Sequence, residues 1–556
     1  MQKLSQNPTF RKSVSILLRA VAVLIILLFV WKRAQWDGGV APLIQTDAQI
    51  KTYQTAQYAA NGLSDHRCYY GGGVWDRTFQ YFPFHYPWVV YTEETRSAET
   101  CRFQYPSFFS QMFAPLYRLT GYRFLNPAIL LFYFLAAFLT YRIATARLGL
   151  SKDVGVTVLI LALTGYPQNS GFEYSETVMS NVCFLFFLDR TLKLLGEDTD
   201  EVALASLACG IIGSLAVFLR SESVFYYSAL GIGTVLFWKL SFPVLLKKFR
   251  FLVIGFLVGV FAFAFLNYHE FGAILGIRSR ISYADFLKLN WSTKLELLKG
   301  YFLGSRIQVG LLSYCFPVLA AAFAFPVWKK RETTGVYFLL LFTGVSGMLL
   351  VQTFSPYNPG GLYAGLRFTE ITYYCLILLA GTILNSTGSG DKRPIPYLLY
   401  VLCILQIFFS LYHTKKNLQV VDFVKKHHDL LQKEWNSYPR YPVVHKSLFD
   451  MFLVSTSYLD KPHFVAKDEK AWDGLESILA ENEVPGIQVF YFGTTPPKDI
   501  NAPQDFYEEW IDTKYTIRSD RYRLEEKKTV EGFVLERYVL DSKTNGRKKK
   551  ETSASK

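Results

Sequence analysis

The chain has 556 residues, of which 51% are hydrophobic and 19% are charged, and its formal net charge at neutral pH is +14. Most of the apolar residues stand in long runs separated by short basic loops. A soluble globule cannot bury so many runs that are each long enough to cross a hydrocarbon core of ~30 Å. The pattern excludes a soluble enzyme, a disordered chain and a collagen-like fibre. It predicts a polytopic α-helical membrane protein.

About eleven of these runs approach the ~20 residues that a helix needs to cross a bilayer. We expect spans near 13–31, 126–146, 154–168, 175–189, 202–219, 222–240, 250–268, 309–328, 335–354, 369–386 and 396–412. The first run has basic flanks and no small-residue cleavage site after it, which indicates an uncleaved anchor rather than a signal peptide.

The loops between the runs alternate in charge. Lys and Arg gather at 142–152, 190–193, 247–250, 329–331 and 392–393, whereas the loop near 166–175 contains neither. By the positive-inside rule the N-terminus is cytoplasmic, and an odd number of spans then places the C-terminal region outside an inner cell membrane. The positive charge is therefore read as a signal of orientation in the bilayer, and nucleic acid is not an expected partner.

Three domains follow from this layout. Residues 1–412 form a transmembrane domain with a large first outer loop, 32–125, and residues 413–545 turn charged and polar. In the polar part, helical stretches near 416–435 and 468–482 alternate with a strand-like run at 488–492, which predicts an extracytoplasmic α/β domain. Residues 546–556 read as a disordered basic tail.

The first outer loop begins with a helix signal. Thr46 followed three residues later by Gln49 is a capping-box pattern, and Gly62 is a natural stop for the helix 47–60. We expect this helix to lie at the membrane surface with Asp47 in its first turn, where the helix dipole favours an ionised carboxylate. The simplest role for Asp47 is to help cap this helix.

The same loop contains Cys68 and Cys101, together with His66 and His85. In an oxidising compartment the two cysteines can form a disulfide, which we favour. The alternative is a zinc site made by the two cysteines and two histidines, although the spacing matches no tight structural zinc motif. The other cysteines fall in spans and read as small buried hydrophobic residues.

Charged residues also stand at the outer ends of spans. Glu176, with Glu173 before it, opens the fourth span, and Arg220 and Glu222 share the short turn between the fifth and sixth spans. A charge at a span end is costly unless it is paired or hydrated. Arg220 is read either as an ion-pair partner of Glu222 or as a phosphate ligand, because a guanidinium suits both.

The order of these features resembles the GT-C superfamily of polyprenyl-phosphate-sugar-dependent glycosyltransferases, which includes protein O-mannosyltransferases and the lipid A aminoarabinose transferase. Four segments carry the resemblance, in chain order Thr46-Asp47-Ala48-Gln49, Tyr105-Pro106-Ser107 with the helix that follows, Tyr174-Ser175-Glu176, and Gly365-Leu366-Arg367-Phe368. Many relatives carry paired acids in the first loop, whereas Asp47 stands alone between Thr46 and Ala48.

The resemblance implies transfer of a sugar from a polyprenyl-phosphate donor to a glycan, lipid or protein acceptor at the outer face of the membrane. Such chemistry needs a carboxylate to take the acceptor's proton, and Asp47 is the expected general base. Glu176 is its expected partner, with Glu173 competing for that role.

Cationic groups must also hold the donor phosphate as negative charge builds on it. Arg367 is the first candidate because it follows three glycines, with Arg220 and then Arg278 behind it. No cofactor is expected, and a divalent metal is conceivable only if Asp47 and Glu176 converge. Two other readings remain: a flippase of lipid-linked glycan precursors, or an inactive relative that acts as an assembly factor.

Overall fold

The computed structural model describes residues 8–35, 46–64, 70–83, 89–90, 102–103, 105, 107–196, 203–238, 241–276, 286–287, 290–304, 309–329, 334–355, 366–387, 394–447, 457–492, 515–530 and 533–541. The chain divides into two compact units. The helical unit comprises Met1–Gly39 and Tyr122–Val420, and the α/β unit comprises Val40–Gly121 and Val421–Lys556. The first outer loop thus joins the C-terminal region in one unit, whereas the sequence grouped it with residues 1–412.

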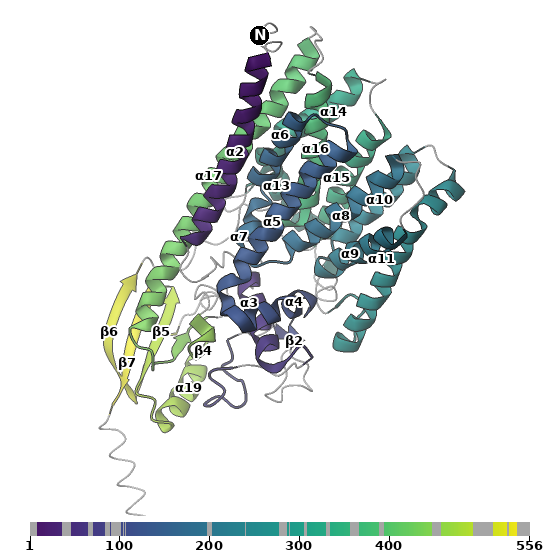
Figure 1. The fold of residues 1–556 in the computed structure, drawn as a ribbon. Coiled ribbons are helices and arrows are strands. Elements are labelled where there is room, and N and C mark those ends of the chain that lie inside the picture. The colour runs from purple at the N-terminus through teal and green to yellow at the C-terminus, as the bar shows by residue number, and fades with distance from the viewer. Residues whose placement is uncertain are drawn as a thin grey trace, which may run out of the picture. The chain divides into compact units, whose positions relative to one another are not determined.

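The helical unit is a bundle of helices (Figure 1). In chain order it contains α2 (Pro8–Ala34), α5 (Leu125–Arg142), the π-helical turn η4 (Ile143–Arg147), α6 (Lys152–Thr164), α7 (Gln168–Phe172), α8 (Thr177–Gly196), α9 (Ala203–Leu219), α10 (Ser223–Phe237), α11 (Phe242–Phe271), α13 (Trp291–Leu303), α14 (Leu311–Trp328), α15 (Gly335–Phe354), η5 (Arg367–Thr369), α16 (Glu370–Thr387) and the first part of α17 (Pro394–Asn436).

Seven helices among the described residues are long and apolar enough to cross a membrane, which agrees with a helical membrane protein. They are Lys12–Ala34, Ser107–Arg147, Pro243–Phe271, Leu311–Trp328, Gly335–Phe354, Arg367–Ser386 and Tyr397–Gln419. The predicted number of eleven spans is wrong by this measure. Helices also form at four other predicted runs, namely 154–168, 175–189, 202–219 and 222–240. These helices, α6, α8, α9 and α10, are not long and apolar enough to count as spans.

Three of these four helices are too short to count as spans, and the fourth carries too many charges. At ~1.5 Å per residue, the 13 residues of α6 reach only ~20 Å and the 15 residues of α10 only ~22 Å. Helix α9 has 17 residues. Helix α8 has 20, but Asp189, Arg190 and Lys193 stand in its second half.

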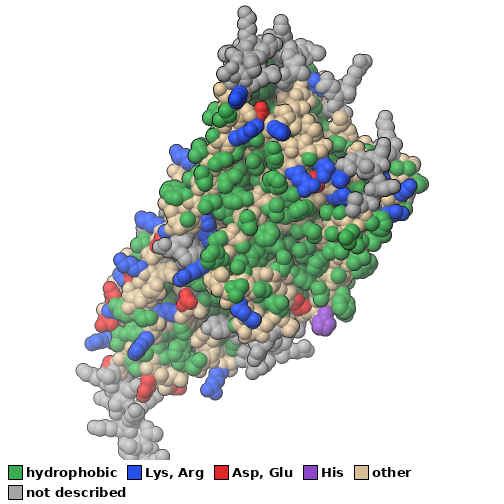
Figure 2. All heavy atoms as spheres, in the orientation of Figure 1, with side chains coloured by type: hydrophobic (Ala, Val, Ile, Leu, Met, Phe, Trp, Pro, Cys, Tyr) green, Lys and Arg blue, Asp and Glu red, His purple; other side chains and the backbone are tan. Residues whose placement is uncertain are grey.

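Helices α9 and α11 approach each other closely because glycines line their contact. A Cβ atom added at Gly210 would collide with the backbone of α11 near Leu252, and one added at Gly255 would collide with the carbonyl group of Leu207. Small residues at such contacts let helix backbones meet inside a bilayer, where apolar burial does not drive association. Away from this contact, α11 exposes large apolar side chains, among them Ile254, Phe261 and Phe265, and Figure 2 shows hydrophobic side chains gathered over this part of the helical unit.

The α/β unit contains two helices from the first outer loop, α3 (Thr46–Asn61) and α4 (Ser107–Thr120). The predicted helix and its stop are confirmed, since Gly62 has a φ of +109°. Residues 48–59 of α3 are buried within the protein, and the position of this helix at the membrane surface stays a prediction. Gln54, for example, accepts a hydrogen bond of 3.0 Å from Ser110 of α4, and Tyr458 donates one of 2.7 Å to the carbonyl oxygen of Gln49.

The sheet of the α/β unit has five strands in the order β4-β3-β5-β7-β6 (Figure 1). They are β3 (Val443–His445), β4 (His463–Val465), β5 (Gly486–Phe492), β6 (Tyr522–Val530) and β7 (Phe533–Leu540). Strands β4, β3 and β5 are parallel, while β5, β7 and β6 are antiparallel. Helix α19 (Glu469–Glu481) connects β4 to β5, and a two-stranded ribbon pairs β1 (Val89–Val90) with β2 (Arg102–Phe103). The predicted α/β domain is therefore present.

Apolar residues from both chain segments share the cores of this unit. One core brings together Ile50, Phe82, Leu431, Val443 and Phe490. A Cβ atom added at Gly72 would overlap the ring of Phe464 in β4, so the first loop packs closely on the sheet. Cys68, Cys101, His66 and His85 lie outside the described residues, and the disulfide and zinc readings stay predictions.

Candidate functional site

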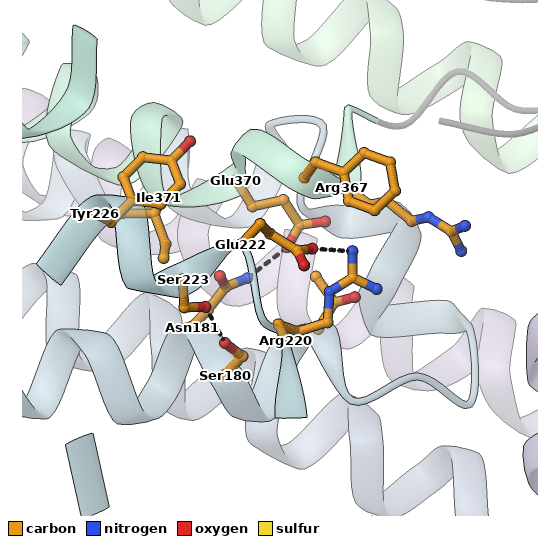
Figure 3. Close-up of a pocket in the computed structure, with 11 residues that line it drawn as sticks. Ser180, Asn181, Arg220, Glu222, Ser223, Tyr226, Arg367, Glu370 and Ile371 are labelled. Carbon is orange, nitrogen blue, oxygen red and sulfur yellow. Dashed lines mark hydrogen bonds and ion pairs between the residues drawn. The ribbon is translucent and has the colours of Figure 1, made fainter. Parts of the chain in front are cut away.

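Three helices of the helical unit begin around one small pocket (Figure 3). The pocket is lined by residues at the starts of α8, α10 and α16, together with Arg220 and Arg367. Helix N-termini expose unpaired N–H groups and favour negative charge, so this point of the bundle suits carboxylates and other anions. The described side chains leave about 10 Å³ of free volume, which is room for roughly one water molecule and not for a sugar ring.

Arg220 forms the centre of the charged cluster. Its Nη1 atom lies 3.2 Å from Glu176 Oε1, and its Nη2 atom pairs with Glu222 Oε1. The side chains of Arg220 and Glu176 are only 4% and 2% exposed. A buried guanidinium is thus held between two carboxylates that stand just before α8 and α10, where both helix dipoles favour negative charge.

A phenylalanine lies next to both arginines. The Cζ atom of Arg220 is 4.9 Å from the centre of the Phe368 ring, and that of Arg367 is 5.3 Å from the same ring. Both distances fall in the range of cation–π contacts. In Figure 3 the Arg367 guanidinium extends away from the pair formed by Arg220 and Glu222.

Glu370, the first residue of α16, supplies a further carboxylate. Its Oε1 atom accepts a 2.5 Å hydrogen bond from Ser170, and its Oε2 atom accepts one of 2.5 Å from Asn181. The side chain is 1% exposed, and it interacts electrostatically with Arg220 and Glu173. The acid is therefore fixed between α7, α8 and α16 by two neutral donors.

The structure brings several of the predicted site residues together. Arg220 and Arg367 line the pocket, Glu176 pairs with Arg220, and Glu173 interacts electrostatically with Glu370. Of the two readings of Arg220, the ion pair with Glu222 is present, and Glu176 is an additional partner. Asp47 lies in the first turn of α3, but the position of its side chain is outside what the structure describes, as is Arg278 altogether.

Sequence reasoning missed Glu370, Asn181 and Ser170. A signal for Glu370 was present, since an acid at the beginning of the predicted span 369–386 marks a candidate functional residue. Asn181 and Ser170 gave no such signal, because neutral polar residues are common in helices and become informative only beside an acid.

Within the described residues, no group of three or more His, Cys, Asp and Glu side chains is arranged to hold a metal ion. At the pocket the guanidinium of Arg220 stands between Glu176 and Glu222, in the place where a cation shared by these two acids would lie. No protein-family model matches this chain, and no curated protein matches it significantly.

Proposed function

We propose that this protein is a membrane glycosyltransferase of the GT-C type. In this proposal it transfers a sugar from a polyprenyl-phosphate donor to an envelope glycan, lipid or protein at the outer face of the inner membrane. The observation that carries the proposal is the convergence of three helix N-termini, two arginines and buried acids in one pocket of the bundle. The ordered sequence motifs that resemble the superfamily supply the rest of the support.

The reaction exchanges one bond for another. The acceptor hydroxyl oxygen forms a bond to the anomeric carbon, the bond from that carbon to the phosphate oxygen breaks, and polyprenyl phosphate leaves as an anion. The hydroxyl proton passes to the carboxylate of Asp47 and then to water. Glu176 orients the acceptor in this scheme.

The arginines have different parts in this scheme. Arg220 already bridges Glu176 and Glu222, so its task is to position Glu176. We assign the donor phosphate to Arg367, assisted by the helix N-termini. Because the pocket has a free volume of only about 10 Å³, it accommodates one phosphate oxygen while the sugar ring lies outside it.

The experiment is sugar transfer in proteoliposomes that contain the purified protein, a panel of polyprenyl-phosphate sugars and envelope extract as acceptor. Asp47→Asn is expected to abolish transfer, and Arg367→Gln is expected to lower it at least tenfold. Asp153→Asn is the matched control, because Asp153 is also an aspartate in a helix first turn, and it should retain transfer.

Two results would change the assignment. An Asp47→Asn protein with full activity removes Asp47 as the base. Movement of the lipid across the vesicle membrane without any sugar transfer identifies a flippase. Comparing the envelope glycans of cells with and without the protein then identifies the sugar and the acceptor.

A further inference from the structure

The helical unit contains a second, larger cavity that shares no lining residue with the candidate site. Its free volume is about 290 Å³, and it is lined by Phe187 and Thr191 of α8, by α10 between Tyr227 and Val235, and by α11 between Leu245 and Leu257. The lining along α11 covers about 18 Å at ~1.5 Å per residue. This is close to half of the ~30 Å hydrocarbon core, or one leaflet. The cavity thus has the length and the apolar lining that suit a single lipid chain.

Two buried hydroxyl groups on this lining have no hydrogen-bond partner among the described residues. They belong to Thr191, which is 3% exposed, and to Tyr227, which is 9% exposed. By contrast, Thr234 on the same lining donates a 2.8 Å hydrogen bond to the carbonyl oxygen of Leu230. A buried hydroxyl without a partner costs free energy. The natural occupant is therefore a molecule that also carries polar atoms.

Positive charge lies at one end of the cavity. Lys247, Lys248 and Arg250 lie in the first turns of α11, next in sequence to the lining residues Leu246 and Phe249 but outside the lining itself, and the first turn of that helix contains no acid. Thr191 lies at about the level of Gly255, farther along α11 than these cations. Its neighbour Arg190 donates a 2.8 Å hydrogen bond to Ser206 near the start of α9, and Leu207 of α9 lies against Gly255 of α11.

We infer that this cavity binds an anionic glycerophospholipid. One acyl chain occupies the apolar channel, an ester carbonyl accepts a hydrogen bond from the Thr191 hydroxyl, and the phosphate lies beside Lys247 and Lys248. Basic residues near a membrane surface attract anionic headgroups, and the positive end of the α11 dipole adds to this attraction. The inference concerns a bound membrane lipid and does not depend on the glycosyltransferase assignment.

The test uses the full-length protein in detergent, titrated with phosphatidylglycerol and, separately, with phosphatidylcholine of the same acyl chains. Native mass spectrometry counts the lipids bound to each molecule. We expect one phosphatidylglycerol to bind about tenfold more tightly than phosphatidylcholine. Replacing Lys247 and Lys248 by Gln should remove most of this preference.

Two matched variants test the cavity itself. Thr191→Val removes the unpartnered hydroxyl and should weaken phosphatidylglycerol binding about fivefold, the worth of one neutral hydrogen bond. Thr234→Val removes a hydroxyl that is already bonded within α10 and should change binding less than twofold. Gly231→Leu should weaken binding at least tenfold. A Cβ atom at Gly231 meets nothing within 4 Å, so this side chain fills the cavity without a collision.

Three results would overturn the inference. The first is equal binding of the two lipids. The second is phosphatidylglycerol binding that neither Thr191→Val nor Gly231→Leu weakens. The third comes from a parallel titration with polyprenyl phosphate: if only this lipid binds with the expected sensitivity to Thr191→Val and Gly231→Leu, the cavity holds the chain of an isoprenoid lipid. If Gly231→Leu does not fold, the comparison of Thr191→Val with Thr234→Val decides.

Discussion

Arg220 and Glu176 form a buried ion pair, with Nη1 and Oε1 3.2 Å apart, although 44 residues separate them in the chain. Glu222 adds a second carboxylate to the same guanidinium. Charges taken out of water are stable only when they are paired, and removing one partner leaves the other uncompensated. The ion pair therefore links the end of α9 to the start of α8.

Replacing Arg220 by Met should destabilise the helical unit by about 3–5 kcal/mol, since the buried carboxylate of Glu176 and the partly buried one of Glu222 lose their cation. Thermal unfolding in detergent measures the change. The double variant Arg220→Met with Glu176→Gln should recover part of the loss. As a control, Lys425→Met breaks the Lys425–Asp429 pair on an exposed helix face and should cost less than about 1 kcal/mol. Equal effects of the two single changes would contradict the prediction.

Gly255 tests the close contact between α9 and α11. Gly255→Leu should lower stability by about 1–3 kcal/mol or more, because the new side chain meets the backbone at Leu207 and forces the helices apart. The melting temperature in detergent is the measurement. Gly196→Ala is the control, since nothing lies within 4 Å of a Cβ atom there. An unchanged melting temperature for Gly255→Leu would show that the helices are not in contact at this point.

The two buried histidines His445 and His463 should make the stability of the α/β unit depend on pH. Their Nε2 and Nδ1 atoms lie 2.8 Å apart between β3 and β4, and His463 also contacts Ser457 at 3.0 Å. Burial lowers the pKa of His445 to about 3 and the pKa of His463 well below 6.5, and the neighbouring His445 and Lys461 lower the latter further. Both rings are therefore neutral in the folded protein at pH 7.

The direction of this pH dependence follows from proton uptake by the unfolded chain. As the pH falls below about 6.5, the unfolded chain binds protons at these two positions and the folded chain does not, so stability decreases from there toward pH 3. Hydrogen exchange of β3 and β4 at pH 7 and pH 5, expressed as protection factors relative to the intrinsic exchange rate at each pH, should show lower protection at pH 5. His445→Asn with His463→Asn should flatten this difference, whereas exposed His269→Asn should leave it. A protection factor that is the same at both pH values would refute the prediction.

Asp76 holds the first-loop segment 70–83 in place. Its carboxylate accepts hydrogen bonds from the backbone N–H groups of Gln80 at 3.0 Å and Tyr81 at 2.7 Å, and from the Tyr70 hydroxyl at 3.1 Å. Asp76→Ala leaves these donors without an acceptor and should cost about 3 kcal/mol. Hydrogen exchange should rise in both segment 70–83 and β4, because Gly72 packs on Phe464.

The control for Asp76→Ala is the same change at Asp468, an aspartate whose capping hydrogen bond is exposed. Asp468 caps α19 by accepting a 2.7 Å hydrogen bond from the N–H group of Ala471, and Asp468→Ala should cost about 1 kcal/mol. If Asp76→Ala costs no more than this, the segment is held by packing instead of by its carboxylate.

Local signals in the sequence predicted local structure well. The capping pattern at Thr46 and Gln49 and the stop at Gly62 locate α3 within a residue or two, and the runs at 468–482 and 488–492 match α19 and β5. The number of spans was harder to predict, because hydropathy averages over a window and does not reveal that α6 ends at Thr164 after 13 residues.

Long-range partners could not be read from the sequence. The turn at Arg220 and Glu222 allowed either an ion pair or a phosphate ligand, and nothing near it identified Glu176 as the second carboxylate. The burial of α3 depends on contacts such as the one from Tyr458 to Gln49, which are 409 residues apart. Such contacts depend on the whole fold, and no pattern within a short window encodes them.

The make-up of the α/β unit has a consequence for biosynthesis. Its first segment ends at Gly121 and its second begins at Val421, so α3 and α4 leave the ribosome long before the strands that cover them. At ~5–20 residues per second, the wait is roughly 15–60 seconds. During this time the apolar faces of Ile50, Tyr53 and Phe82 lack their partners. The unit must therefore mature after translation, and the early segment is a natural client for a chaperone until the last strands arrive.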